Sequence, residues 1–285
     1  MITGMYDLTP VEDRGGRWYK RDDLFRHPSG VNGAKWRQCQ WLVRRMRAEG
    51  APLIVTGASV LSPQHAMTAV AAAESGLPSL HVVGGTTPDK ARKHPSVRLA
   101  VQYGAALHAI PVGYNPALQA EVRRLAEEHG AGVLRYGVTT DRDVAAFHRL
   151  GAAQAANVPP GLRSLIVPFG SGNSAASILT GLAEHPDPPE AVHLVGIGPN
   201  RLSWLYERLD RVGVGELPFG VAHHDLHGTG VVAYGRAVRY TSDGIVLHPT
   251  YEGKVAAWAD SHPQLLPGWG ERDGTAALWI VGGPL

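Results

Sequence analysis

Cysteine is almost absent from this chain, because Cys39 is the only one among 285 residues. A single thiol cannot form an internal disulfide, which favours a reducing, cytoplasmic setting. Long apolar runs are missing as well: none approaches the ~20 residues that a membrane-spanning helix needs, and no basic-then-apolar leader follows Met1. The sequence therefore predicts a soluble protein with no membrane partner.

Charge of one sign is not in excess either, since 27 Lys and Arg residues face 25 Asp and Glu residues. This balance gives no reason to expect nucleic acid as a partner, and leaves that class of partner open. Arg44, Arg45 and Arg47 lie close together, but their spacing is typical of the solvated side of an amphipathic helix. With 44% hydrophobic residues, the chain can bury the core of one large domain or two modest ones.

Short apolar runs alternate with alanine-rich helical stretches along most of the chain. This alternation predicts an α/β protein in which helices cover a parallel sheet. The predicted strands are residues 53–56, 80–83, 106–110, 164–167 and 192–197, and the predicted helices are residues 63–75, 95–103, 116–129, the stretch after 173, and 203–211.

Several familiar active-site motifs are missing around the turn Gly170-Ser171-Gly172-Asn173-Ser174, which follows an apolar run. No lysine follows it, so it is not a Walker motif, and it lacks the third glycine of the dinucleotide fingerprint and the spacing of a hydrolase elbow. What remains is a strand, a glycine turn and a helix start, whose N–H groups favour a phosphate. The alternative is an ordinary tight connection.

Lysine is scarce, with five in the whole chain, and Lys35 lies among small residues in the turn 29–37. An amine in such a turn is a candidate for covalent chemistry. Lys254 is the rival candidate, although an ion pair with the nearby Glu252 is a simpler explanation for it.

A serine-proline pair and a tyrosine-glutamate pair mark two further candidate positions. Ser62 and Pro63 predict a helix start whose amides attract a carboxylate, or else simply the start of a buried helix. Tyr251 could transfer protons and Glu252 could pair with a cationic ring nitrogen. Their alternatives are a packing residue and a helix-start carboxylate.

Three histidines lie close together in the segment 221–229, which the sequence indicates to be a loop. His223, His224 and His227 could suggest a metal site, but no second cluster of ligands accompanies them. We interpret them as structural or surface residues and predict no metal. His148 and His193 are interpreted as ordinary packed or surface residues.

Four segments, by their order and spacing, resemble those of a known family: Tyr19–Leu24, Asn32–Arg37, Gly170–Ser174 and Pro249–Lys254. The second resembles a Gly-Asn-Lys-x-Arg signature with its first two residues transposed. The third resembles a Gly-Ser-Gly-Gly-Thr phosphate cup, and the fourth a Pro-Val-Tyr-(Glu/Thr)-Gly-Lys stretch. Together they are similar to the fold type II, tryptophan synthase beta-like enzymes that use pyridoxal phosphate, and within them to the branch of aminocyclopropane carboxylate deaminase and D-cysteine desulfhydrase.

The resemblance implies a two-domain α/β fold with parallel-rich, twisted sheets covered by helices. It implies a large cofactor-binding domain of residues 1–45 and 141–285, a small α/β domain of residues 46–140, and a homodimer. The cofactor is then pyridoxal 5'-phosphate. The substrate is then an amino acid or related amine, which reacts through an external aldimine in a deaminase, lyase, isomerase or decarboxylase reaction.

The same resemblance gives individual residues their roles. Lys35 becomes the Schiff-base lysine and, once freed, a base, while Tyr251 becomes the second acid or base and Glu252 the partner of the ring nitrogen. Cofactor contacts fall to Gln64 and to Gly170, Ser171, Gly172, Asn173 and Ser174, and substrate contacts fall to Ser62, Gln64 and His65.

Two departures from the family pattern bear on the reaction. Ser62-Pro63-Gln64-His65 stands where the family has Gln-Ser-Asn-His, and Val281 stands where it has a threonine before two glycines. A hydroxyl that handles substrate is therefore lost, and ring-opening deamination is disfavoured. Two hypotheses stay open: an enzyme whose substrate is free or attached to a larger molecule, and a diverged cofactor-binding protein with a binding or regulatory role.

Overall fold

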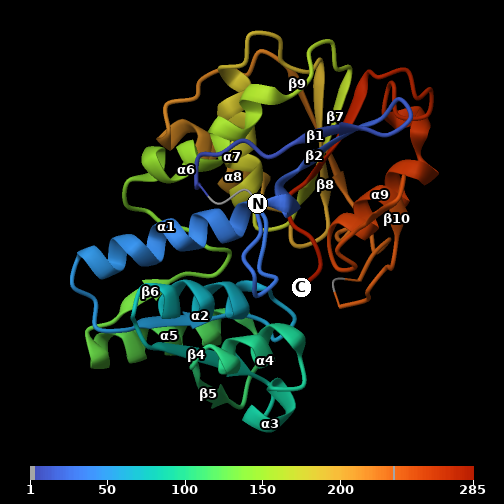
Figure 1. The fold of residues 1–285 in the computed structure, drawn as a ribbon. Coiled ribbons are helices and arrows are strands. Elements are labelled where there is room, and N and C mark those ends of the chain that lie inside the picture. The colour runs from blue at the N-terminus through green and yellow to red at the C-terminus, as the bar shows by residue number, and fades with distance from the viewer. Residues whose placement is uncertain (1–3, 234) are drawn as a thin grey trace. The chain divides into compact units, whose positions relative to one another are not determined.

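A computed structural model describes residues 4–233 and 235–285 of the chain, which form two compact units (Figure 1). Unit 1 comprises the residues up to 26, residues 32–34 and residues 142–284, and unit 2 comprises residues 27–31, 35–141 and 285. Each unit contains a parallel-rich sheet covered by helices, which confirms the predicted fold class. The division into residues 1–45 with 141–285, and residues 46–140, stays a prediction.

Unit 1 is built on a six-stranded sheet with the strand order β1-β2-β12-β7-β8-β9. β1 pairs antiparallel with β2 at one edge, and all the other neighbours are parallel. A separate antiparallel pair is formed by β10 and β11. The strands are β1 (Val11–Asp13), β2 (Trp18–Arg21), β7 (Ser164–Phe169), β8 (Ala191–Gly196), β9 (Gly220–Asp225), β10 (Thr241–Ser242), β11 (Ile245–Val246) and β12 (Ala276–Ile280), and the helices are η1 (Asp22–Leu24), α6 (Val144–Ala152), η2 (Ala153–Asn157), α7 (Asn173–Ala183), α8 (Leu202–Arg211), α9 (Glu252–Ser261) and η3 (Pro263–Leu265).

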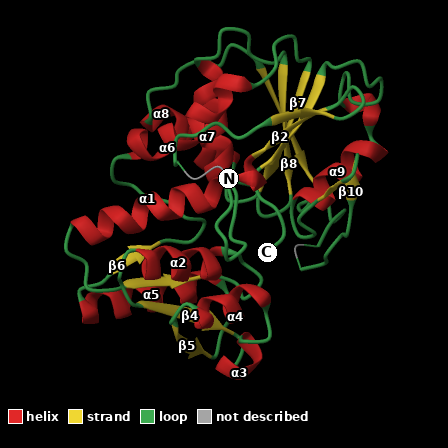
Figure 2. Ribbon diagram, in the orientation of Figure 1, coloured by secondary structure: helices red, strands yellow, loops and turns green. Residues whose placement is uncertain are grey.

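Both faces of the unit 1 sheet are covered by helices. Successive side chains of a strand point to opposite faces, so one strand contributes to the core on each side. Leu165 and Val167 of β7 belong to a hydrophobic cluster with α7 and α8, whereas Ile166 belongs to a second cluster with α9. Figure 2 shows α6, α7 and α8 on one side of the strands and α9 on the other. A continuous apolar run such as residues 165–167 is what a strand covered on both faces requires.

Unit 2 has a smaller, fully parallel sheet with the strand order β5-β4-β3-β6. Leu118 and Val122 of α5 pack on Val55 and Val82 at one face, while α2 and α4 pack against each other. Its elements are α1 (Ala34–Ala48), whose first residue is grouped with unit 1, β3 (Ile54–Gly57), α2 (Gln64–Glu74), β4 (Ser79–Gly84), α3 (Pro88–Ala91), α4 (Pro95–Gln102), β5 (Ala106–Ile110), α5 (Asn115–His129) and β6 (Gly132–Leu134).

The strands and helices predicted from the sequence are confirmed to within two residues at each end. One expectation is wrong: the segment from Val221 is not simply a loop, because it forms β9. That strand has no alternating apolar pattern, but its backbone pairs with β8 along its whole length, with His193 opposite Ala222. His223 and His224 therefore lie on a strand. None of the helices in the described residues has the length and apolarity for a membrane crossing.

Candidate functional site

The predicted site residues are shared between the two units. Unit 1 carries Tyr251, Glu252 and the turn Gly170–Ser174, called the glycine turn below, and unit 2 carries Lys35, Ser62, Gln64 and His65.

The glycine turn joins β7, which ends at Phe169, to α7, which begins at Asn173. The predicted order of strand, turn and helix start is therefore confirmed. The N–H groups in the first turn of a helix have no partner inside the helix, and the helix dipole adds partial positive charge there. This end of α7 is suited to an anion.

Two hydroxyl groups of the glycine turn strengthen that argument. The Oγ atoms of Ser171 and Ser174 are buried, and neither has a hydrogen-bond partner within the described part of the chain. Leaving a buried hydroxyl without a partner costs about 1–3 kcal/mol, so each one needs an explanation. A phosphate offers several acceptor oxygens and would satisfy both hydroxyls together with the helix N–H groups.

Gly172 shapes the turn, because only a glycine suits its position. Its φ of +83° lies in the left-handed region, and a Cβ atom there would be 2.9 Å from the Trp204 ring. The indole of Trp204 on α8 thus supports the turn from outside. Backbone N–H groups can then approach a bound anion closely.

Glu252 is the first residue of α9 and is 1% exposed. Its Oε1 accepts a hydrogen bond of 3.0 Å from the N–H of Gly282, which follows β12. β12 and β7 are parallel neighbours, so Gly282 and the glycine turn follow the same edge of the sheet. Ligands of parallel α/β sheets bind outside the carboxyl ends of the strands.

The residues after β12 also hold the start of α1. The N–H of Gly283 donates to Oδ1 of Asn32 at 2.6 Å, and the N–H of Ala34 donates to the carbonyl of Val281 at 2.9 Å. Gly33 has a φ of +87°, and a Cβ atom there would be only 2.3 Å from the Val281 carbonyl oxygen. The Asn-Gly order of this segment is therefore the one that this close approach requires.

Lys35 follows directly on Ala34 as the second residue of α1 and is half-buried. The backbone on its N-terminal side is fixed by the contacts of Asn32 and Ala34. Its rival Lys254 is 2% exposed, and its Nζ donates to the carbonyl of Ala233 at 2.9 Å. Burial lowers the pKa of Lys254. The amine of Lys254 is therefore engaged in a contact of its own, and Lys35 remains the candidate for covalent chemistry.

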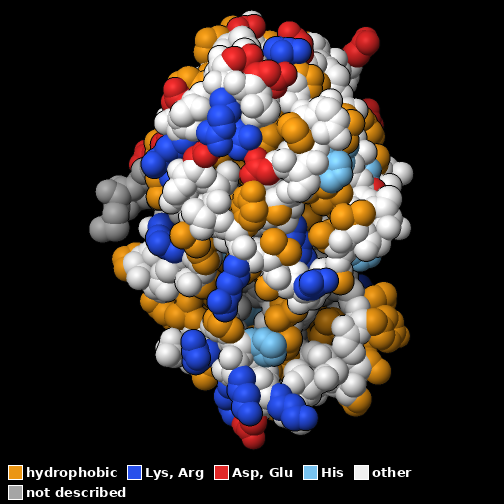
Figure 3. All heavy atoms as spheres, turned by 90° about the vertical axis from the view of Figure 1, so that its right-hand side faces the viewer, with side chains coloured by type: hydrophobic (Ala, Val, Ile, Leu, Met, Phe, Trp, Pro, Cys, Tyr) orange, Lys and Arg blue, Asp and Glu red, His pale blue; other side chains and the backbone are white. Residues whose placement is uncertain are grey.

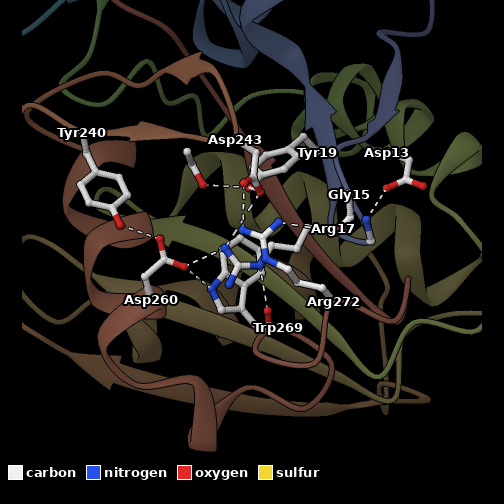
Figure 4. Close-up of polar contacts among 11 residues, drawn as sticks. Asp13, Gly15, Arg17, Tyr19, Tyr240, Asp243, Asp260, Trp269 and Arg272 are labelled. Carbon is white, nitrogen blue, oxygen red and sulfur yellow. Dashed lines mark hydrogen bonds and ion pairs between the residues drawn. The ribbon is translucent and has the colours of Figure 1, made fainter.

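The far end of α9 is anchored by a polar network around Asp260 (Figure 4). Its Oδ1 accepts from Arg17 at 2.8 Å and from the Trp269 indole at 2.9 Å, and its Oδ2 accepts from the hydroxyl of Tyr240 at 2.6 Å. The Arg17 guanidinium also lies 4.1 Å from the Trp269 ring centre. This network fixes the helix that begins at Glu252.

Tyr251 immediately precedes α9 and is half-buried. Its ring lies against that of His248, with the two ring centres 5.0 Å apart. Nδ1 of His248 accepts from the Thr250 N–H at 3.2 Å, so this nitrogen carries no proton. The phenol group of Tyr251 is thus attached to a short, internally bonded loop.

In unit 2, Ser62–Ala66 form the start of α2 and are called the proline turn below. Three of its potential donors are unavailable for a ligand. Pro63 has no N–H, the N–H of Gln64 donates to Ser62 Oγ at 3.2 Å, and the N–H of Ala66 donates to Ser96 Oγ at 3.1 Å. This helix start is therefore poor in donors for a carboxylate, although the sequence predicts one that attracts it.

The side chain of Gln64 is 2% exposed and is fully occupied inside unit 2. Its Nε2 donates to Oγ1 of Thr56 at 2.8 Å and to the carbonyl of Arg135 at 3.0 Å, and its Oε1 accepts from the N–H of Gly137 at 2.9 Å. These bonds connect β3 to the loop after β6. The predicted cofactor contact of Gln64 stays a prediction, and its present partners give the residue a structural task.

His65 is completely buried and belongs to a histidine pair. Its Nε2 lies 3.1 Å from the carbonyl of Ala58 and its Nδ1 lies 3.2 Å from Nδ1 of His81. Because a carbonyl only accepts, Nε2 of His65 carries the proton and His81 donates to Nδ1. Burial lowers the pKa of His65 to about 4 and that of His81 well below its usual value. Both rings are neutral at pH 7.

The histidines of β8, β9 and α6 are packed residues. His193 stacks on His224 with ring centres 5.4 Å apart, and burial lowers the pKa of His193 to about 4. His148 is buried, with Nδ1 2.8 Å from Ser177 Oγ. Within residues 4–233 and 235–285, no group of three or more His, Cys, Asp or Glu side chains is arranged to hold a metal ion.

Sequence reasoning missed the structural tasks of three residues that shape these regions. Asn32 receives the N–H of Gly283, and Ser96 bridges α4 to the proline turn. Val138 has a φ of 60°, which is strained for a β-branched residue, and it follows Gly137, whose N–H donates to Gln64. Strain of this kind concentrates at functional sites. Only the Asn-Gly pair gives a signal in the sequence, as a turn.

Comparisons with known proteins agree with this geometry. A family model described as pyridoxal-phosphate dependent enzyme matches residues 4–248. The chain is similar to an O-seryl-dTMP PLP-dependent decarboxylase of Salmonella phage ViI, with 34% identity over 93% of this chain and 77% of that protein. It is also similar to a D-cysteine desulfhydrase of Salmonella paratyphi A, with 28% identity over 88% of this chain and 82% of that protein.

Solved structures show the same fold at low identity. An ACC deaminase homologue superposes with a TM-score of 0.76 and 20% identity, covering 99% of this chain and 91% of that one. A threonine deaminase from Solanum lycopersicum superposes with a TM-score of 0.66 and 15% identity, covering 99% and 82%.

Proposed function

The chain belongs to the family of pyridoxal-phosphate dependent enzymes and uses pyridoxal 5'-phosphate, and from this premise we propose that it decarboxylates an amino acid carried on a nucleotide. The relative with 34% identity, named as an O-seryl-dTMP decarboxylase, supports this substrate class. A role without turnover has no support, because the relatives and solved structures above all carry enzyme names. The observation in this chain that carries the proposal is Pro63 in the proline turn.

Decarboxylation places a special demand on the carboxylate of the substrate. The carboxylate loses its negative charge as carbon dioxide leaves, so donors that bind it strongly stabilise the ground state more than the transition state. The proline turn offers few donors, since Pro63 has no N–H and those of Gln64 and Ala66 are used internally. A donor-poor turn supports loss of the carboxylate over reactions that retain it.

The residues of unit 1 fit the cofactor. The glycine turn would hold its phosphate through the hydroxyls of Ser171 and Ser174 and the first N–H groups of α7. The carboxylate of Glu252, oriented by the N–H of Gly282, would hold a proton on the ring nitrogen. We assign the covalent attachment to Lys35. When bound, the cofactor supplies an electron sink for the pair left at the substrate α-carbon.

The chemistry left to the protein is a proton transfer. The bond from the α-carbon to the carboxylate breaks, carbon dioxide leaves, and the electron pair stays with the α-carbon until a proton is added there. The Nζ of Lys35 and the phenol of Tyr251 are the proposed proton carriers. The product is a primary amine still attached to the nucleotide.

The direct test is turnover of O-seryl-dTMP by protein loaded with pyridoxal phosphate. We expect release of carbon dioxide and a nucleotide product lighter by one carbon dioxide in mass spectrometry. A Lys35→Ala variant, checked for folding by circular dichroism, serves as the control and should give no product. Hydrogen sulfide from D-cysteine together with an unchanged seryl nucleotide would overturn the proposal.

We further propose that the protein is a homodimer of the cytoplasm, with the large and small domains divided as the sequence predicts. The resemblance supports the dimer, and the single cysteine supports a reducing setting. Cys39 is completely buried, and burial raises the pKa of its thiol to about 12, so the thiol is protonated and unreactive. Light scattering after size exclusion measures the assembly state directly.

A further inference from the structure

We propose that a basic segment of unit 2, Lys90–Arg98, which runs from the end of α3 into α4, binds the phosphate of the nucleotide part of the substrate. This inference rests on the function proposed above. In a nucleotide whose amino acid is attached to the base, the phosphate lies a base and a sugar away from the reacting atoms. The phosphate therefore needs a binding surface of its own, outside the proline turn. The segment Lys90–Arg98 supplies positive charge at such a place.

The charge of this segment is unusual for the chain. Residues 88–98 contain four Lys or Arg residues and a single carboxylate, in a chain whose net charge is only +2. Lys90 and Lys93 are exposed, whereas Lys20 and Lys254 are 1% and 2% exposed and Lys35 is half-buried. The only two exposed lysines among residues 4–233 and 235–285 thus lie three positions apart.

Most of this charge is available to a ligand. Arg92 pairs with Asp89 at 2.8 Å, but across the described residues no ion pair is formed by Lys90, Lys93 or Arg98. Figure 3 shows Lys and Arg side chains gathered at the lower end of the view, over α3 and α4.

Two arginines of α1 make an instructive contrast within the same unit. Arg45 pairs with Glu49 at 2.9 Å, and Arg47 donates to the carbonyl of Gly76 at 3.1 Å. Those arginines are engaged in local contacts along and beside their own helix. Unlike Lys90 and Lys93, they are not available as an anion site.

The basic segment is attached directly to the proline turn. Oγ of Ser96, which is 5% exposed, donates to the carbonyl of Ser62 at 2.7 Å and accepts from the N–H of Ala66 at 3.1 Å. The strands β3 and β4, which precede the proline turn and the basic segment, are parallel neighbours, so both segments follow the same edge of the sheet. An amino acid at the proline turn and an anion at the basic segment would therefore belong to one binding surface of unit 2.

The test measures nucleotide binding without requiring turnover. Thymidine 5'-monophosphate is titrated calorimetrically into the cofactor-loaded wild type and into a Lys90→Gln, Lys93→Gln double variant. We expect the double variant to bind about tenfold more weakly, because two charge-assisted contacts to phosphate are lost. The difference should shrink as salt is added, since exposed charges are screened. Thymidine, which has no phosphate, should bind both proteins equally.

An Arg44→Gln, Arg123→Gln variant is the matched control, because it removes two exposed positive charges from other helices of unit 2. It should keep the affinity of the wild type. Equal affinity of the lysine variant and wild type, equal losses in both variants, or no binding of the nucleotide to the wild type would each overturn the inference.

Kinetics separate this inference from the proposed function. With O-seryl-dTMP, the lysine variant should show a raised KM and an unchanged kcat, since the lysines do not touch the reacting atoms. Lysine-dependent binding of thymidine 5'-monophosphate without any decarboxylation would refute the function and support the phosphate site. Tighter lysine-dependent binding of a single-stranded oligonucleotide than of the mononucleotide would overturn the assignment to a free nucleotide.

Discussion

The glycine turn of unit 1 and the proline turn of unit 2 have the same outline, since each connects a strand of a parallel sheet to a helix. Their polar groups differ. In the glycine turn, two buried hydroxyls lack a partner within the described residues, while in the proline turn the hydroxyls of Ser62 and Ser96 receive the N–H groups of Gln64 and Ala66. One helix start is prepared for an anion, and the other has two of its N–H groups bonded within its own chain.

The polar groups of the glycine turn therefore serve ligand binding, whereas those of the proline turn serve the stability of the folded protein. Unsatisfied groups in the glycine turn reduce the stability of the protein alone and are compensated when a ligand binds, because ligand binding stabilises the folded state. The proline turn has the opposite balance: its bonds stabilise unit 2 and leave little for a ligand. Variants at the two turns should therefore affect different quantities.

The largest effect is expected for Lys35→Ala. It should lower turnover on the order of 10³-fold or more, because both covalent attachment and a proton carrier are lost. The glycine turn should still bind the cofactor without a covalent bond. Borohydride reduction, digestion and mass spectrometry of the wild type should find the cofactor on the peptide of Lys35. A cofactor adduct on Lys254 would contradict this assignment.

The next effect is expected for a Ser171→Ala, Ser174→Ala double variant. The dissociation constant of pyridoxal phosphate should rise about 10- to 100-fold, while thermal stability without cofactor should stay equal or rise, because unpartnered hydroxyls are removed. Ser177→Ala is the matched control on the same helix. It breaks the contact with His148 and should lower stability with little change in cofactor affinity. Equal affinities in the double variant and wild type would show that the glycine turn is not the phosphate site.

Acid should destabilise the proline turn through His65. Burial lowers its pKa from 6.5 to about 4, so between these values the unfolded chain binds a proton that the folded chain does not. The contribution of His65 to stability is complete above pH 6.5 and disappears as the pH falls towards 4; it amounts to about 3 kcal/mol. Calorimetry from pH 7 to pH 4.5 should find a smaller loss of stability in His65→Gln than in wild type. Parallel curves would contradict a neutral, buried His65.

The two turns also show what a sequence can predict. The glycine turn can be predicted because its signal is local: residues 165–167 form an apolar run, as a strand buried on both faces requires, and glycines follow within a few residues. The internal hydrogen bonds of the proline turn cannot be predicted in this way, because they depend on Ser96, which lies 34 residues from Ser62 in the chain. Gln64 is similar, since its partners include Gly137 beside the strained Val138.

Long-range contacts explain the remaining limits. The bond between Asn32 and Gly283 joins residues 251 positions apart, and the position of β12 between β2 and β7 follows from no local pattern. Alternating strands and helices predict a parallel sheet but do not give the order of its strands. The catalytic roles of Lys35, Tyr251 and Glu252 came from the resemblance, and they stay predictions until variants test them.

The smallest expected effect is also the sharpest test of the comparison. Pro63→Ser would add one N–H and one hydroxyl to the proline turn and make it more like an anion-binding helix start. The carboxylate of the substrate should then bind more tightly before the reaction than in the transition state, so KM should fall and kcat for decarboxylation should fall about three- to tenfold. Pro116→Ser, in the first turn of α5, is the control for loss of a proline at a helix start. A kcat in Pro63→Ser that equals or exceeds that of the wild type would show that scarcity of donors in the proline turn does not favour decarboxylation.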